Sequence, residues 1–240
     1  MKMNLTCVGA VGGLMVAGVA SGGAFQSLTM ELYNSGIQGE TYRLFANVEA
    51  GAQVNAVFGN AAGDLEIGTI TGASLYQNSL GGATSQAINS AFFGLAPSLE
   101  WDSYVSIGAL YANGSPFGSN DLLDIGIDFS AWEGGGDLFS DNGSWFATTG
   151  TAQSAEVGGQ VFLGQFTVVG GLGDANDLIG QVSLQGEDAN GNTWQEIGAT
   201  WNTGSGGSSG GTGGSSAVPG IGAIAPLCFV GLVRKRRRQG

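Results

Sequence analysis

The sequence predicts an all-β fold, an antiparallel β-sandwich of the jelly-roll or Ig-like kind, and three observations support it. The chain of 240 residues contains 46 Gly, and Gly in a helix interior costs about 1 kcal/mol relative to Ala. Ten stretches alternate apolar and polar residues with the period of half-buried strands. Asn-Gly pairs at 113–114, 142–143 and 190–191 supply the positive φ angles of tight turns.

The alternating stretches follow one another without intervening helices. In chain order they cover residues 25–33, 41–48, 53–58, 65–71, 104–110, 122–129, 145–148, 160–169, 178–185 and 193–201. Residues 84–93 have the best helical pattern, and we expect a helical turn or a loop there. We expect the last three strands to form a meander. Strands in this arrangement favour two antiparallel sheets packed face to face.

The predicted sandwich spans residues 25–203 and is preceded by an apolar N-terminal segment. Residues 1–24 have the pattern of a secretory signal peptide, because Lys2 precedes an apolar stretch that ends in small residues. Those small residues allow cleavage after Ala20 or Ala24. The alternative for this segment is a buried N-terminal helix.

Two further segments follow the predicted domain. Residues 204–216 are almost entirely Gly, Ser and Thr, the composition of a flexible linker. Residues 217–240 combine a Pro-containing motif, an apolar segment and a terminal basic cluster. We expect the apolar parts of both chain ends to be helices outside the domain.

The C-terminal segment resembles the PEP-CTERM sorting signal of exported bacterial proteins. The sorting motif is Val218, Pro219 and Gly220, where that family carries Pro-Glu-Pro, and the basic anchor is Arg234, Lys235, Arg236, Arg237 and Arg238. The resemblance implies recognition by an exosortase-like protease after passage through the export machinery. It also implies delivery to the cell surface, outer membrane or extracellular matrix of a Gram-negative-type bacterium. The alternative is a tail that stays uncut as a membrane anchor.

Three stretches of the body, at 41–59, 96–108 and 126–147, resemble uncharacterised surface proteins of planctomycete-like and other aquatic bacteria that carry the same kind of tail. This resemblance implies export. It brings no catalytic residues with it.

Charge is divided sharply between the ends and the body. Six of the seven basic residues lie near the ends, whereas residues 25–233 hold all 19 acidic residues and the single cation Arg43, a formal charge of −18. This composition excludes nucleic acid as a partner, because phosphate is bound by Lys and Arg. We expect membrane contact through the termini only, and Arg43 to pair with a carboxylate.

The residue types in the body exclude most catalytic templates. The chain has no His, and its two Cys, Cys7 and Cys228, lie in the terminal apolar runs. The body therefore cannot hold Ser-His-Asp or Cys-His catalytic arrangements, disulfides, or zinc bound by Cys or His. We therefore expect no enzymatic activity. The alternative is a glycoside hydrolase using Glu100, Asp102 and Glu133, with the first two on one face of a strand.

Two kinds of binding site are candidates. Carboxylate and amide oxygens suit Ca²⁺, and two clusters supply them: Asp174, Asn176 and Asp177, and Asp188, Asn190 and Asn192. Ordinary turns capped by Asn and Asp are the alternative for both. Trp101 and Trp132 are candidates for stacking on a polysaccharide, with packing in the core as the alternative.

The sequence thus predicts an exported surface or extracellular-matrix protein without catalytic activity. The alternative is a carbohydrate-binding module or a weak glycosidase.

Overall fold

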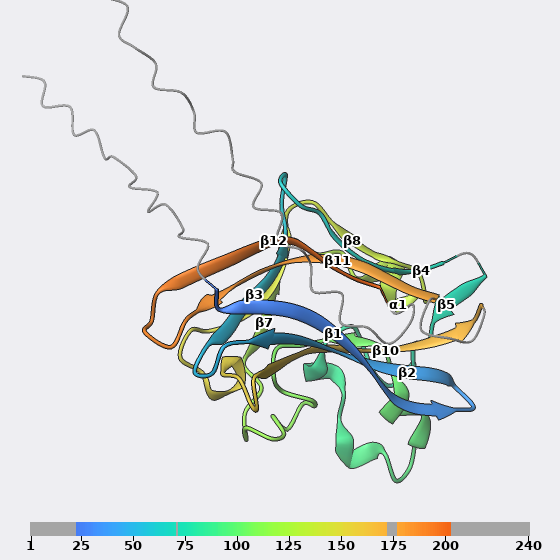
Figure 1. Ribbon diagram of the computed structural model, residues 1–240. Helices are drawn as coiled ribbons and strands as arrows, with labels where there is room; N and C mark the ends of the chain where they lie inside the picture. Colours follow the sequence, from blue (N-terminus) through green and yellow to red (C-terminus); the bar gives the residue numbers. More distant parts are fainter. Residues whose placement is uncertain (1–22, 71, 172–176, 203–240) are drawn as a thin grey trace, which may run out of the picture.

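The computed structural model describes residues 23–70, 72–171 and 177–202. These residues form two antiparallel sheets packed face to face (Figure 1), which confirms the predicted β-sandwich. The signal peptide, the linker, the sorting signal and their expected helices lie outside the described residues.

The five-stranded sheet has the order β1-β2-β10-β5, with β6 also paired to β10. Its strands are β1 (Phe25–Gly36), β2 (Gly39–Val48), β5 (Ala73–Leu75), β6 (Tyr104–Val105) and β10 (Gln160–Gly170). The inward positions of β2 are buried and apolar, namely Tyr42, Leu44, Ala46 and Val48. Alternation of this kind places one face of a strand on the core.

The seven-stranded sheet has the order β7-β9-β3-β11-β4-β8, with β12 also paired to β11. Its strands are β3 (Gln53–Gly59), β4 (Leu65–Thr69), β7 (Leu122–Ile125), β8 (Leu138–Ser140), β9 (Gly143–Ala147), β11 (Leu178–Glu187) and β12 (Thr193–Asn202). Phe25 of β1 and Trp194 of β12 stack with ring centroids 6.3 Å apart. This contact joins the two sheets, whose facing side chains form the main core.

The helices in the described part of the chain are short. They are η1 (Ser85–Ala87), η2 (Ser90–Phe92), η3 (Pro97–Trp101), η4 (Ala152–Ser154) and α1 (Ser130–Glu133). The helical turn expected within residues 84–93 is confirmed by η1 and η2.

The predicted meander of the last three strands is wrong. β11 and β12 do form an antiparallel pair, but β10 belongs to the other sheet, between β2 on one side and β5 and β6 on the other. Every residue of β10 from Val161 to Val168 is buried. A central strand covered on both faces cannot be assigned to a sheet from its own alternation.

A covering segment, residues 76–121, lies along β10 on the outer side of the five-stranded sheet (Figure 1). It forms a second, smaller apolar cluster with the sheet, built from Ile88, Leu99, Tyr104 and Phe162. The Gln165 side chain of β10 donates to the backbone oxygens of Glu100 and Asp102 at 2.8 and 3.1 Å. The covering segment carries the candidate site described next.

Candidate functional site

The candidate site is built around a loop, residues 78–82, which is attached to the buried side chain of Asp102. Asp102 Oδ1 accepts hydrogen bonds from the backbone N–H groups of Asn78 at 2.7 Å and Ser103 at 3.1 Å. Its Oδ2 accepts from the N–H of Gly82 at 3.1 Å. One carboxyl group therefore fastens both ends of the loop to the end of η3.

Gly81 has to be a glycine because of this attachment. A Cβ atom at Gly81 would overlap Asp102 Oδ2. The loop closes with a turn in which the N–H of Gly81 donates to the carbonyl of Asn78 at 2.9 Å. The sequence interpretation did not use the Gly81-Gly82 pair, which could have indicated a tight loop, and nothing in the local pattern points to Asp102 as its partner.

Burial raises the pKa of Asp102 from 3.8 to about 7, and this effect outweighs the three backbone hydrogen bonds, which lower it. The charge of Glu133 adds a smaller upward contribution. A carboxyl group with this pKa is present in both protonation states near neutral pH. Both of its oxygens are nevertheless engaged by the chain.

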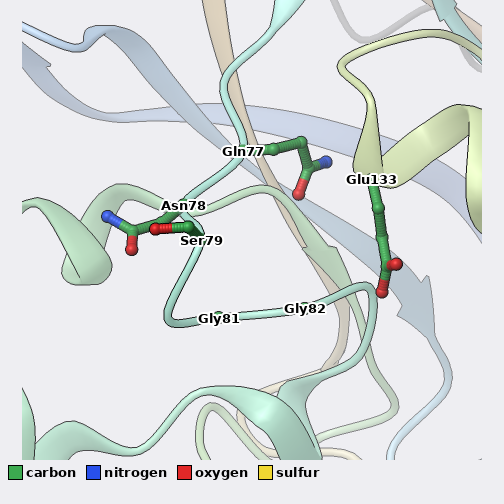
Figure 2. Close-up of a pocket in the computed structure, with 6 residues that line it drawn as sticks. All are labelled: Gln77, Asn78, Ser79, Gly81, Gly82 and Glu133. Atoms are coloured by element: carbon green, nitrogen blue, oxygen red, sulfur yellow. The ribbon is translucent and has the colours of Figure 1, made fainter.

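A pocket of about 330 Å³ lies next to the loop, lined by Gln77, Asn78, Ser79, Gly81, Gly82 and Glu133. Figure 2 shows the side chains of Gln77 and Glu133 bordering the same space, while those of Asn78 and Ser79 point away from Glu133. The Asn78 amide instead donates to Ser98 Oγ at 3.0 Å and to Tyr76 at 3.1 Å. We call this space the loop pocket.

Gln77 and Glu133 give the loop pocket its chemical character. Gln77 Nε2 is buried and has no hydrogen-bond partner, so it is a free donor next to the pocket. Glu133, at the end of α1, adds an exposed carboxylate, which accepts hydrogen bonds. A donor and an acceptor facing one space suit a ligand with hydroxyl groups. The sequence interpretation missed Gln77, because a lone Gln carries no motif.

The three carboxylates considered for glycoside hydrolysis are placed differently from the prediction. Glu100 lies in the 3-10 helix η3 and Asp102 is the residue that ends it, so the expectation that they share a strand face is wrong. Of the three, Glu133 alone lines the loop pocket. Hydrolysis of a glycosidic bond usually needs two carboxyl groups flanking that bond, and Asp102 sits behind the loop with its oxygens engaged.

The two candidate tryptophans have different surroundings. Trp132 is fully buried, donates through Nε1 to the carbonyl of Ser103 at 3.3 Å, and packs edge-on against Phe166 at 5.8 Å. Its ring therefore offers no face to a sugar. Trp101 is partly exposed and packs against Tyr33, with ring centroids 6.2 Å apart. The structure does not bring the two indoles together on one platform.

The second calcium candidate is a capped turn between β11 and β12. Asp188 Oδ1 accepts from the backbone N–H groups of Asn190 and Asn192, each at 2.8 Å, and Oδ2 accepts from the Asn192 side chain at 2.8 Å. These bonds, the Asn192 side chain first, lower the pKa of Asp188. The geometry is that of an Asx turn.

The first calcium candidate is only partly described. Asp177 is buried at the start of β11, whereas Asp174 and Asn176 lie outside the described residues. Within the described ranges, no three His, Cys, Asp or Glu side chains gather as metal ligands would. Calcium binding by either cluster stays a prediction.

No described carboxylate pairs with Arg43, so the expected ion pair is not found in the part of the chain that the structure describes. Its Cζ atom instead lies 3.4 Å from the centroid of the Tyr33 ring, and its Nε donates to Gln165 Oε1 at 3.2 Å. Arg43 Nη2 is buried without a hydrogen-bond partner. The one cation of the body thus lies among aromatic rings.

The chain matches no protein-family model, no curated protein and no solved structure. In the part of the chain that the structure describes, none of the helices has the length and apolar character needed to cross a bilayer. Function is therefore inferred from the geometry of the site and from the organisation of the sequence.

Proposed function

We propose that this protein is an exported component of the cell surface or extracellular matrix, without catalytic activity, and that its C-terminal sorting signal delivers it there. The observation that carries this proposal is the division of charge. Six of seven basic residues lie near the two ends beside apolar runs, and 19 acidic residues lie between them. Short basic clusters beside apolar runs stay on the cytoplasmic side of a membrane during export.

The sandwich between those ends suits a role outside the cell. Its core is built from packed sheets and contains no Cys, so its folding does not depend on disulfide formation. Its one cation is held over the Tyr33 ring, and its formal charge is strongly negative. High net charge keeps a protein soluble and repels it from anionic lipid surfaces.

The placement of the carboxyl groups supports a role in binding or assembly. Asp102 has the raised pKa that general acids often show, but it fastens the loop at residues 78–82. Glu133 reaches the loop pocket without Glu100 or Asp102 among the lining residues. This arrangement favours binding of a ligand at the pocket over cleavage of it.

Replacing the five residues of the basic anchor by Ser tests the delivery step, and replacing the four Arg by Lys gives a charge-matched control. Antibodies against the sandwich then follow each protein in intact and fractionated cells. We expect the wild type and the Lys control on the outer surface, and the Ser variant to be missorted. Equal surface display of all three would contradict sorting through the basic anchor.

Binding of a neutral polysaccharide at the loop pocket is the second candidate function, and the free Gln77 Nε2 donor is the observation that favours it. Sugar hydroxyls both donate and accept, so they complement an amide donor and the Glu133 carboxylate. A glycan array probed with the wild type and with Gln77→Leu tests this function. Gln26→Leu, on the exposed side of β1, is the matched control.

We expect Gln26→Leu to bind glycan as the wild type does and Gln77→Leu to bind at least tenfold more weakly. Gln77→Leu removes the donor that the sugar hydroxyl would pair with, and a buried hydroxyl left without its partner costs binding free energy. An array on which the wild type binds no glycan would contradict the carbohydrate function and leave the delivery proposal untouched.

A further inference from the structure

We propose that a groove beside Arg43 binds an apolar monocarboxylate, with the guanidinium group of Arg43 receiving the carboxylate. The groove holds about 250 Å³ and is separate from the loop pocket. Its apolar lining includes Phe45 of β2 and Phe162 of β10 together with Leu110, Phe117 and Val157. We call it the Arg43 groove.

The lining of the groove is mostly apolar. Aromatic rings and aliphatic side chains form most of it, and the polar side chains that line it belong to Arg43 and Gln160. The Gln160 amide already donates to Asn47 Oδ1 at 3.1 Å and to Glu31 Oε1 at 3.3 Å. Arg43 therefore supplies the unused donor capacity of this groove.

The guanidinium group of Arg43 is not paired with any described carboxylate, although the body is strongly acidic. Nη2 is buried and makes no hydrogen bond, and Arg43 forms no ion pair with any described carboxylate. Glu31 stands opposite Arg43 in the β1–β2 register, but its carboxylate accepts from Gln160. Arg43 as a whole is partly buried. A charged donor that is buried without a partner is costly, although the chain has 19 acidic residues that could have supplied one.

Neighbouring hydroxyl groups compensate for this charge only in part, because the Tyr111 hydroxyl lies within hydrogen-bonding reach of Arg43 while Nη2 stays without a partner. The Tyr104 hydroxyl is itself buried without a hydrogen-bond partner. Burial raises the pKa of both Tyr104 and Tyr111, while the positive charge of Arg43 acts in the opposite direction. Both phenols are therefore neutral at physiological pH, and an anion is the group that would complete this site.

Aromatic rings flank Arg43, which also lines the groove. The Tyr33 ring covers one face of the guanidinium group at 3.4 Å, and the Phe162 ring lies 5.8 Å from Cζ. The N–H groups of a guanidinium point outward in its plane, so a ring on its face does not block them. Two parallel N–H···O bonds in that plane are the usual mode of Arg–carboxylate recognition.

The volume of the groove limits the size of the ligand. A water molecule occupies about 30 Å³ of liquid, and at roughly that volume per heavy atom 250 Å³ accommodates about eight heavy atoms. An eight-carbon carboxylate, with eight carbon and two oxygen atoms, is close to this size. We therefore choose octanoate as the probe, with 1-octanol and octylammonium as neutral and cationic matches of the same chain length.

Isothermal titration of the full-length chain at pH 7 with the three probes tests the proposal. We expect octanoate to bind at least tenfold more tightly than octanol, because a hydrogen bond to a charged group contributes about that factor or more. Octylammonium should bind more weakly still. Arg43→Met, which keeps an apolar stem but removes the charge, should reduce octanoate affinity to that of octanol.

Three further variants lie at exposed positions outside the core. Val157 is 63% exposed, and Val157→Trp should fill the groove and abolish binding, whereas Val169→Trp, at a residue 39% exposed on the far end of β10, should leave binding intact. Glu31→Gln should tighten octanoate binding by removing a nearby negative charge. Equal affinity for octanoate and octanol, no binding of octanoate at millimolar concentration, or equal effects of the two Trp variants would overturn the proposal.

Discussion

Protonation of Asp102 makes the stability of the fold depend on pH near neutrality. Its pKa is about 7 in the folded protein against 3.8 for an ordinary Asp. Because the folded-state pKa is the higher one, the folded chain holds this proton more tightly than the unfolded chain does. The resulting contribution to stability is fully present below pH 3.8 and is lost as the pH rises through 7.

The size of this effect follows from the two pKa values. Between pH 5 and pH 8, a group that titrates at 3.8 unfolded and at about 7 folded lowers the free energy of unfolding by about 2 to 3 kcal/mol. Hydrogen bonds to the carboxylates of Asp128, Glu156 and Asp188 lower their pKa values, so these groups titrate below this window.

Urea unfolding at pH 5, 6, 7 and 8 measures this loss, followed by tryptophan fluorescence. Asp102→Asn is the comparison, because Asn cannot titrate and its NH₂ group would face the N–H of Gly82 donor to donor. We expect the wild type to lose about 2 to 3 kcal/mol across the series and Asp102→Asn to start lower and stay flat. A wild-type curve without slope, or the same slope in both proteins, would refute the assignment to Asp102.

Three other predictions concern packing and metal binding. Gly81→Ala should destabilise the fold by about 1 to 3 kcal/mol, because its new Cβ would overlap Asp102. Gly94→Ala is the control: Gly94 has open space around it, so its stability should change by less than about 0.5 kcal/mol. Similar urea midpoints for the two variants would contradict the predicted overlap at Gly81. Trp132→Ala should cost about 3 to 5 kcal/mol as a core truncation, and Trp101→Ala clearly less, by the same assay. Asp188→Asn should not alter the response of the thermal midpoint to Ca²⁺ and EDTA, since the Asp188 oxygens are already hydrogen-bonded within the turn. A rise with Ca²⁺ that EDTA reverses and Asp188→Asn removes would instead establish a calcium site at this turn.

The strands that the sequence predicted well are those with one face on the core. In β2 the buried positions alternate cleanly from Tyr42 to Val48, so its identity and its C-terminal limit followed from local pattern, while the strand begins two residues before the predicted start at residue 41. The three-residue strands β5 and β8 were missed because they are too short for alternation to show. The predicted strand at 104–110 shortens to Tyr104–Val105, since the positive φ of Gly108 and its close approach to the Gln153 backbone break the extended chain.

The candidate site depends on contacts that no local pattern reveals. Asp102 meets Asn78 and Gly82 across separations of 24 and 20 residues, and its burial arises from the way the covering segment packs on β10. The excess of acidic residues predicted a carboxylate partner for Arg43. The number of charges does not say where they lie in the fold, however, and the strand register places the guanidinium group beside Tyr33 and Gln165.

Intact mass of the protein recovered from the surface and cytoplasmic fractions of the same cells tests the central proposal most directly. We expect a chain that begins after Ala20 or Ala24 and ends near Pro219, because export removes the signal peptide and an exosortase-like protease would remove the basic tail. A full-length mass, carrying both ends and recovered with the cytoplasmic fraction, would contradict export and sorting together.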